Sequence, residues 1–240
     1  MIKLEHVVLA SPEQMEFIIE GMRNPMNSWE KRDSDRCSSI YACDIHYDHC
    51  DKCIHSNKRI GGDFAIGDND HSLMQRLANA GTDHRKFMRM MPVYVRITAP
   101  LYWWKEFDTY KVATVANSCS TMHKIAEKEF KWEDFSCEHL THTDSFHMDA
   151  NEDAMNALQV VINALNSNRD LYLKTKDKKY WWQMIQLLPS SYNQTRNVMM
   201  NYEVLANIYK SRKDHKLDCW RDFCAWIKTL PYQELITGGN

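Results

Sequence analysis

The chain has 240 residues, and because one domain usually takes roughly 150 residues, it is long enough for one or two domains with a buried core. Thirty Lys and Arg residues against 32 Asp and Glu residues give a net charge of −2, which excludes nucleic-acid binding through bulk positive charge. Only seven residues are glycine, and neither GxGxxG nor GxxxxGK[ST] occurs, so a Rossmann fingerprint and a P-loop are excluded.

The first hundred residues combine two predicted strands with two predicted helices. Residues 2–10 are typical of a strand, and apolar residues at helical spacing indicate a helix over 13–22. Residues 23–70 are polar, rich in turn formers, and contain half of the eight cysteines. A short helix is then predicted over 71–80, and the alternation of apolar and polar residues over 93–97 predicts a half-buried strand.

The remainder of the chain is mainly helical by pattern. The predicted helices span 101–107, 121–129, 151–166, 178–188, 191–211 and 217–228. We therefore expect an α+β fold with a small antiparallel sheet and many flanking helices. It forms one domain over 1–240, and residues 23–70 are a Cys- and His-rich insertion or loop region within it.

The sequence has neither the pattern of a membrane-spanning helix nor that of a secretory signal, and this predicts the cellular compartment. No run approaches the ~18 consecutive apolar residues of a membrane-spanning helix, and the first ten residues lack the basic start and longer apolar core of a secretory signal. We expect a cytoplasmic protein with no membrane partner, whose cysteines stay reduced. They are then free thiols, metal ligands or active-site groups.

Four cysteines lie close together in the sequence, namely Cys37, Cys43, Cys50 and Cys53, with histidines between them. The last two form Cys-x-x-Cys, a spacing that brings two thiolates toward one tetrahedral metal centre. The four residues are therefore a candidate structural metal site, with zinc as the candidate metal. The alternative is a polar loop with ordinary surface thiols, because the spacing from Cys37 to Cys50 is irregular.

A segment dense in aromatic, charged and small polar residues follows the strand predicted over 93–97. Trp103, Trp104 and Phe107 have near-helical spacing, which is typical of core residues. The run from 114 to 123 has too few apolar residues for a buried helix. It forms either a solvated loop or a loop that lines a ligand.

Asn201 and Arg212 form a further candidate pair. Eleven residues at 100° each amount to three turns plus about 20°, so in one continuous helix both side chains share a face. A half-buried arginine there needs an anionic partner, and a phosphate or an acidic imide would serve. The alternative is a surface ion pair with Asp214 or Glu203.

Read together, these segments resemble the flavin-dependent thymidylate synthase family. That family carries RHRxxSxxExSxRY after a strand, and later LPxxxxTxxxxxxNxxSLxxFxxLRxxxxAQxEI. Here the first motif falls on 109–122, the second keeps its spacing at Leu188-Pro189, Asn201, Leu205 and Arg212, and 77–87 is similar to the family's LxxAGHxSPFEH. The resemblance covers roughly residues 70–230.

The resemblance implies an enzyme in which reduced FAD supplies a hydride, a folate supplies a one-carbon unit and NADPH is the reductant. It implies a homotetramer with sites between subunits, and a pyrimidine deoxynucleotide, dUMP by default, as substrate. Arg212 is the implied catalytic residue, which grips and polarises the pyrimidine. The implied cofactor-binding residues are Asn201, Lys111, Tyr110 and Asn117, and the implied substrate-binding residues are Glu106, Thr114, Cys119, Ser120 and Arg212.

The sequence departs from the family motifs at several charged positions. Arg-His-Arg becomes Thr109-Tyr110-Lys111, Glu becomes Asn117, the second Ser becomes Cys119, the final Arg-Tyr becomes Thr121-Met122, and an expected arginine is Ile185. Each lost arginine removes charge-assisted hydrogen bonds of roughly 1.5–3 kcal/mol. His123 and Lys124 compensate in part if the loop shifts by a residue or two.

Two functions follow from this pattern. The first is a divergent flavin-dependent enzyme that transfers a one-carbon unit to C5 of a pyrimidine deoxynucleotide. No Ser-His-Asp, HExxH or cysteine-nucleophile motif occurs, and such an enzyme requires none, so Cys119 and Cys137 are expected to be packing residues. The alternative is a catalytically altered nucleotide-binding or protein-interaction module on the same fold.

Overall fold

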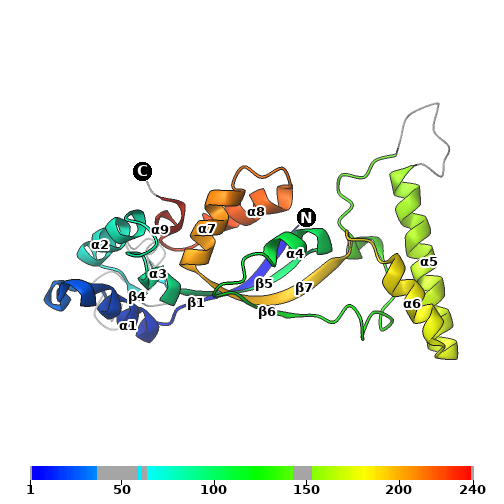
Figure 1. The fold of residues 1–240 in the computed structure, drawn as a ribbon, viewed down its shortest axis with the longest axis horizontal. Helices are drawn as coiled ribbons and strands as arrows, with labels where there is room; N and C mark the ends of the chain where they lie inside the picture. The colour runs from blue at the N-terminus through cyan, green and yellow to red at the C-terminus, as the bar shows by residue number, and fades with distance from the viewer. Residues whose placement is uncertain (1, 37–58, 61–63, 143–152, 239–240) are drawn as a thin grey trace, which may run out of the picture. The chain divides into compact units, whose positions relative to one another are not determined.

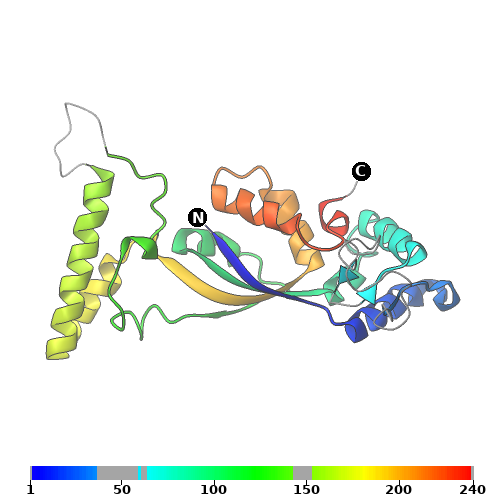
Figure 2. The same ribbon diagram turned by 180° about the vertical axis from the view of Figure 1, so that it is seen from behind.

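The computed structural model describes residues 2–36, 59–60, 64–142 and 153–238, and its architecture is α+β. Four strands, β1 (Lys3–Leu9), β5 (Pro92–Pro100), β7 (Asn193–Asn201) and β6 (Val115–Ser118), form one sheet in the order β1-β5-β7-β6. Neighbouring strands thus come from distant parts of the chain, as Figures 1 and 2 show. The predicted small antiparallel sheet flanked by helices is confirmed.

Hydrogen bonds define the register of β5, β7 and β6. The hydroxyls of Thr98 and Thr195 lie 2.8 Å apart, and Arg96 Nε donates to Asn197 Oδ1 at 3.4 Å. Thr98 thus pairs with Thr195 and Arg96 with Asn197. Because the residue number falls along β5 while it rises along β7, the two strands are antiparallel. Next to β6, the amide of Cys119 donates to the carbonyl oxygen of Thr195 at 2.9 Å.

The chain divides into two compact units. The first unit comprises residues 1–3, 97–109 and 117–196, and the second comprises residues 4–96, 110–116 and 197–240.

The second unit contains most of the helices and a second, minimal sheet. Its helices are α1 (Pro12–Arg23), α2 (Asp68–Asn79), α3 (Phe87–Met90), α7 (Tyr202–Arg212), α8 (Asp218–Ile227) and α9 (Glu234–Thr237). Strands β2 (Asp35–Arg36), β4 (Phe64–Ala65) and β3 (Arg59–Ile60) pair antiparallel in the order β2-β4-β3.

Local sequence explains where α1 and α2 begin and end. Ser11 and Gln14 form a capping box at the start of α1, and Pro12 occupies its first turn, where a missing N–H costs least. The helix predicted over 13–22 is therefore confirmed with slightly wider bounds. After α2 the chain turns through Gly81 at φ +103°, a conformation that favours glycine, as the predicted helix stop requires.

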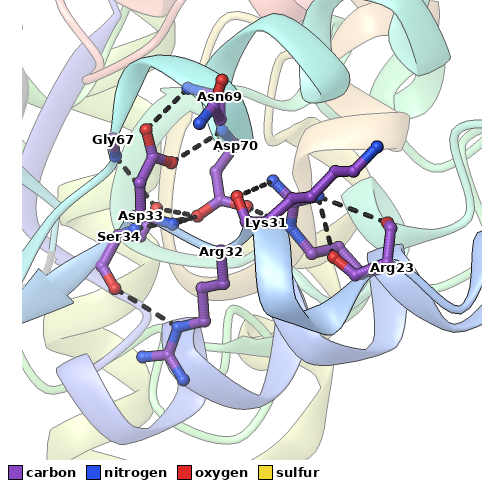
Figure 3. A network of polar contacts seen from close by, with 9 residues as sticks. Arg23, Lys31, Arg32, Asp33, Ser34, Gly67, Asn69 and Asp70 are labelled. Carbon is purple, nitrogen blue, oxygen red and sulfur yellow. Dashed lines mark hydrogen bonds and ion pairs between the residues drawn. The ribbon is translucent and has the colours of Figure 1, made fainter.

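A buried ion pair joins α1 to α2. Arg23 Nε lies 2.6 Å from Asp70 Oδ1, and both side chains are almost completely buried. The other carboxylate oxygen of Asp70 accepts from the Ser34 hydroxyl and from the amides of Asp33 and Ser34. Figure 3 shows Asp70 between Arg23 on one side and Asp33 and Ser34 on the other. This network joins residues 33–34 to the first turn of α2.

The first unit contains α4 (Leu101–Phe107), α5 (Ala154–Thr175) and α6 (Lys178–Leu187). Helices α5 and α6 lie side by side in both ribbon views (Figures 1 and 2) and contact each other along their length. Their apolar faces pack on the loop that follows β6. The buried core of this region comprises Ile125, Ala126, Phe130, Phe135, Leu158, Ile162, Leu165 and Met184.

The predicted helix over 191–211 is wrong in its first half. Residues 193–201 form strand β7, in which Val198 and Met200 are buried at alternate positions, and their backbone pairs with neighbouring strands instead of within a helix. The Asn201 side chain accepts the Val204 amide at 2.9 Å, so α7 begins only at Tyr202. Asn201 is therefore a helix cap and does not share a helix face with Arg212.

The predicted helix over 121–129 is also wrong, because this segment forms bends and turns. Side chains satisfy its backbone groups: Ser120 Oγ accepts the His123 amide at 3.0 Å, and Trp181 Nε1 donates to the Met122 carbonyl at 2.9 Å. Burial of Ile125 then fixes the loop against α5 and α6.

The candidate metal site and the absence of membrane-spanning helices can be compared only with the described residues. Cys37, Cys43, Cys50 and Cys53 lie outside them, so the candidate metal site stays a prediction. Within the ranges given above, no group of His, Cys, Asp and Glu side chains suited to a metal ion is found. None of the helices in these ranges has the length and apolar character needed to cross a membrane.

Candidate functional site

The segment that resembles the family's first motif begins with a tight turn in the second unit. Ala113 lies at φ +58°, a left-handed conformation that a non-glycine residue rarely adopts. The next residue, Thr114, has a buried hydroxyl with no hydrogen-bond partner in the described part of the chain. A buried polar atom without a partner costs stability, so the Thr114 hydroxyl is available for a ligand. Lys111 in the same turn is exposed.

Arg212, at the end of α7, lies in an aromatic environment in the same unit. Its Nε donates to the Tyr110 hydroxyl at 3.0 Å, and its Nη1 lies 3.0 Å from His215 Nε2. The guanidinium carbon is 4.7 Å from the centre of the Trp220 ring, a cation–π distance. These contacts hold the guanidinium plane in one orientation. We refer to Arg212, Tyr110, His215 and Trp220 as the arginine cluster.

The alternative ion pair between Arg212 and Glu203 does not form. Glu203 is buried, and its Oε2 lies 2.7 Å from Nε of Arg85 instead. Arg85 also donates to Asn207 at 3.2 Å. Arg85 therefore binds two side chains of α7, and Glu203 is its ion-pair partner.

A pocket of about 330 Å³ lies in the first unit, where the end of the family-like motif meets β7. Cys119, Ser120 and Thr121 line it from the motif, and Asn193 and Thr195 line it from β7. The volume is that of a small-molecule site. We refer to this cavity as the motif pocket.

Hydrogen bonds and burial fix most of the motif pocket's polar lining. Gln194 Nε2 donates to the Cys119 carbonyl at 3.0 Å, which ties the motif segment to β7. Asn193 Oδ1 is buried and has no hydrogen-bond partner among the described residues. Burial raises the pKa of the Tyr192 hydroxyl, so this group stays protonated at neutral pH and is able to donate a hydrogen bond.

Two lysines line the motif pocket as well. Lys124 forms an ion pair with Glu127, and Lys128 forms one with Asp134. Burial lowers the pKa of Lys128, but the hydrogen bond and the charge of Asp134 outweigh this effect, so its pKa is raised and it stays charged. The loop side of the pocket therefore presents two ammonium groups together with the carboxylate of Glu127, which also lines it.

The structure places the predicted site residues in both units. Tyr110, Lys111, Thr114, Asn201 and Arg212 belong to the second unit, and Glu106, Asn117, Cys119 and Ser120 belong to the first. It brings Tyr110 together with Arg212, and Cys119 with Ser120. Asn117 is exposed on β6, Glu106 is half-buried in α4, and Asn201 is engaged in capping its own helix.

Sequence reasoning missed several of these neighbours. His215 lies beyond the end of α7, and the turn in which its amide donates to the Arg212 carbonyl at 3.0 Å brings it beside the guanidinium. Lys128, Tyr192 and Asn193 reach the motif pocket only because β7 is a strand beside β6. No local pattern reveals that pairing.

The chain has the same fold as several solved structures. The chain is similar to two structures of the flavin-dependent thymidylate synthase ThyX from Helicobacter pylori with FAD and dUMP. They are 17% and 18% identical, with TM-scores of 0.61 and 0.59, and each alignment covers 99% of this chain and 98% of the other. It is also similar to PolB, a UMP/dUMP methylase from Streptomyces cacaoi bound with 5-Br dUMP, at 12% identity and a TM-score of 0.52, covering 99% of this chain and 94% of the other.

No protein-family model matches the sequence, and neither does any curated protein. At identities of 12–18% the similarity establishes the fold alone. The expected resemblance to the thymidylate synthase fold is therefore confirmed. It extends over nearly the whole chain, beyond the residues that carry the sequence motifs.

Proposed function

We propose that this chain is a divergent flavin-dependent enzyme that binds a pyrimidine deoxynucleotide, dUMP by default, and transfers a folate-derived one-carbon unit to its C5 atom. The observation that carries the proposal is the motif pocket. Cys119, Ser120 and Thr121, at the positions of the family's substrate-binding motif, line a cavity that Asn193, with its buried Oδ1, also lines. The nucleotide-bound neighbours of the same fold agree with it.

Arg212 is the proposed catalytic residue. Attack on the one-carbon unit requires negative charge to develop on the pyrimidine ring, and a fixed guanidinium stabilises that charge through paired N–H donors. Two of its nitrogens are held by Tyr110 and His215. Held in this way, Arg212 meets a developing charge without having to reorganise.

Two of the four described cysteines suit a mechanism without a protein nucleophile, whereas Cys119 is exposed, so the expectation that it is a packing residue is wrong. Cys219 and Cys224 are buried, and burial raises the pKa of the Cys224 thiol to about 11, so it is not a thiolate at neutral pH. Catalysis then depends on positioning and on charge stabilisation, as in enzymes whose cofactor carries the chemistry.

The residues of the second unit fit a flavin nucleotide in part. The Thr114 hydroxyl, which has no hydrogen-bond partner in the described ranges, and the exposed Lys111 ammonium are groups that would hold its phosphates. Tyr110 and Asn201 are engaged elsewhere. Asn117, exposed in the first unit, is a further candidate contact. When bound, the flavin supplies the hydride that completes the new methyl group.

Visible absorbance and turnover test the proposal. Protein purified with FAD should show flavin bands and should convert dUMP when a methylene-donating folate and NADPH are added. A colourless protein that stays colourless after FAD is added contradicts the enzyme proposal.

We also propose a homotetramer, and light scattering that finds a monomer at micromolar concentration would argue against it.

A second function is favoured by the altered Arg-His-Arg motif. Tyr110 stands at the histidine position and contacts Arg212, and Lys111 is the one cation left of the three motif positions. The same fold would then bind a nucleotide or a protein without redox chemistry. Nucleotide binding without flavin binding is the result that selects this function.

A further inference from the structure

The cations of the motif pocket lie beyond the segment that resembles the family's first motif. Thr121 and Ile185 stand where the motifs have arginine, so neither supplies charge for a phosphate group. The basic side chains that line the pocket are instead Lys124 and Lys128, both from the loop after β6. That loop reaches the pocket through turns, and the burial of Ile125 holds it in place.

Both lysines are available for a ligand. Lys124 is 64% exposed and its partner Glu127 is 62% exposed, so water and salt screen this pair and it contributes little free energy. Lys128 is 65% exposed, whereas its partner Asp134 is only 16% exposed. A phosphate dianion offers two charges and several acceptor oxygens, so it competes well against Glu127 for Lys124, and the Lys128 ammonium has three N–H donors, of which Asp134 needs only one.

The opposite side of the pocket offers groups of another kind. Asn193 Oδ1 is a buried acceptor that no donor of the described residues reaches, and Tyr192, whose hydroxyl is protonated, also lines the pocket. A ligand that carries both an anionic group and a hydroxyl would satisfy the two sides together. A phosphorylated sugar has this combination.

We propose that Lys124 and Lys128 bind the 5′-phosphate of the nucleotide in place of the missing motif arginines, and that Asn193 accepts a hydrogen bond from its sugar hydroxyl. The proposal deepens the proposed function and rests on it for the identity of the nucleotide. It makes Lys124 and Lys128 substrate-binding residues that select 5′-monophosphates over nucleosides.

Calorimetric titration of the full chain tests this assignment with dUMP, deoxyuridine and inorganic pyrophosphate. The variants are Lys124→Ala, Lys128→Ala and the double variant, and Lys131→Ala is the matched control because this exposed lysine of the same loop does not line the pocket. We expect each pocket variant to weaken dUMP binding about tenfold, as the loss of one charge-assisted contact predicts. Deoxyuridine binding and the control should be unchanged.

Asn193 has its own test with 2′,3′-dideoxyuridine 5′-monophosphate, which lacks the sugar hydroxyl. Wild type should bind this analogue several-fold more weakly than dUMP, and Asn193→Ala should bind both equally. Equal binding by wild type contradicts the role of Asn193.

The three ligands separate failure of this inference from failure of the proposed function. If dUMP binds and the lysine variants bind it as well as wild type does, the phosphate assignment is wrong and the nucleotide function stands. If pyrophosphate binds through the two lysines but dUMP binds no better, the anion site stands and the nucleotide function fails. If wild type binds neither dUMP nor pyrophosphate, the lysine assignment is overturned.

Discussion

Arg212 donates a hydrogen bond from its Nε to the hydroxyl of Tyr110 at 3.0 Å, although the two residues are 102 positions apart in the sequence. Each belongs to one of the two segments that resemble motifs of the flavin-dependent thymidylate synthases. Trp220 packs against both, at 4.7 Å from the guanidinium and 6.0 Å between ring centres from Tyr110. The arginine cluster is therefore a fixed unit in which the direction of the guanidinium is set.

Arg212→Lys should abolish most pyrimidine-nucleotide binding or turnover while the melting temperature hardly moves. Lysine keeps the charge near Trp220 but does not reproduce the paired N–H donors. Stability should stay within about 1 kcal/mol, because the residue is only half-buried. Calorimetric titration with dUMP and thermal unfolding of both proteins check this. Unchanged affinity together with lower stability would show that Arg212 is a structural residue.

Asp70→Asn should destabilise the protein by roughly 3 kcal/mol, because it leaves the buried Arg23 guanidinium without its charge partner. Burial alone raises the pKa of Asp70, but hydrogen bonds from Ser34, Asp33 and Arg23 outweigh it and lower the pKa. The stabilisation is therefore present above the unfolded value near 3.9 and is lost as the pH falls through the lower folded value.

Chemical denaturation from pH 7 to pH 2 measures this effect. Wild type and Asp70→Asn should differ strongly at pH 7 and converge below about pH 4. Asp83→Asn is the control, since Asp83 is exposed. A difference between wild type and Asp70→Asn that is constant across this pH range would contradict the role of the ionised carboxylate.

Gly67→Ala should destabilise the fold by roughly 1–3 kcal/mol through overpacking. A Cβ atom at this position would lie 2.3 Å from Asp33 Cγ and 2.4 Å from the Asp33 carbonyl oxygen. The Asp33 side chain accepts the amides of Asn69 and Asp70 in the first turn of α2, so the clash would displace a helix cap.

Gly21→Ala is the matched control for this substitution. Gly21 lies inside α1 with open space around its Cβ direction, so alanine should stabilise the helix by about 0.5–1 kcal/mol. Denaturation midpoints that move in the same direction for both variants would contradict the role assigned to Gly67.

Elemental analysis of protein purified without chelator tests the candidate site at Cys37, Cys43, Cys50 and Cys53. We expect about one zinc or iron ion per chain. A metal content near zero, with all four thiols titrating freely, would leave the ordinary-loop alternative.

The sequence was informative where structure is local. The strand predicted over 93–97 and the helices predicted over 101–107 and 178–188 all form, because apolar spacing and turn residues there agree with the tertiary packing. The fold family was also accessible, through the spacing between Leu188-Pro189 and Arg212.

What the sequence did not reveal depends on pairing between distant segments. Residues 193–201 belong to a predicted helix, but they lie between β5 and β6 and form a strand. Their three asparagines, with low helix propensity, agree with this outcome. Lys128 and Asn193 line one pocket only as a result of that pairing. The polar composition of residues 114–123 is compatible with both a solvated and a ligand-lining loop. The first part of this segment forms the exposed edge strand β6, and Cys119, Ser120 and Thr121 line the motif pocket.

The proposed enzyme replaces the hydrogen on C5 of a pyrimidine deoxynucleotide with a one-carbon unit. Release of tritium from dUMP labelled at C5 measures that replacement directly. We predict tritium release into water that requires FAD, the folate donor and NADPH together, and that is lost in Arg212→Lys. Protein that binds dUMP with FAD present but releases no tritium under these conditions would contradict the claim and would establish a nucleotide-binding module instead.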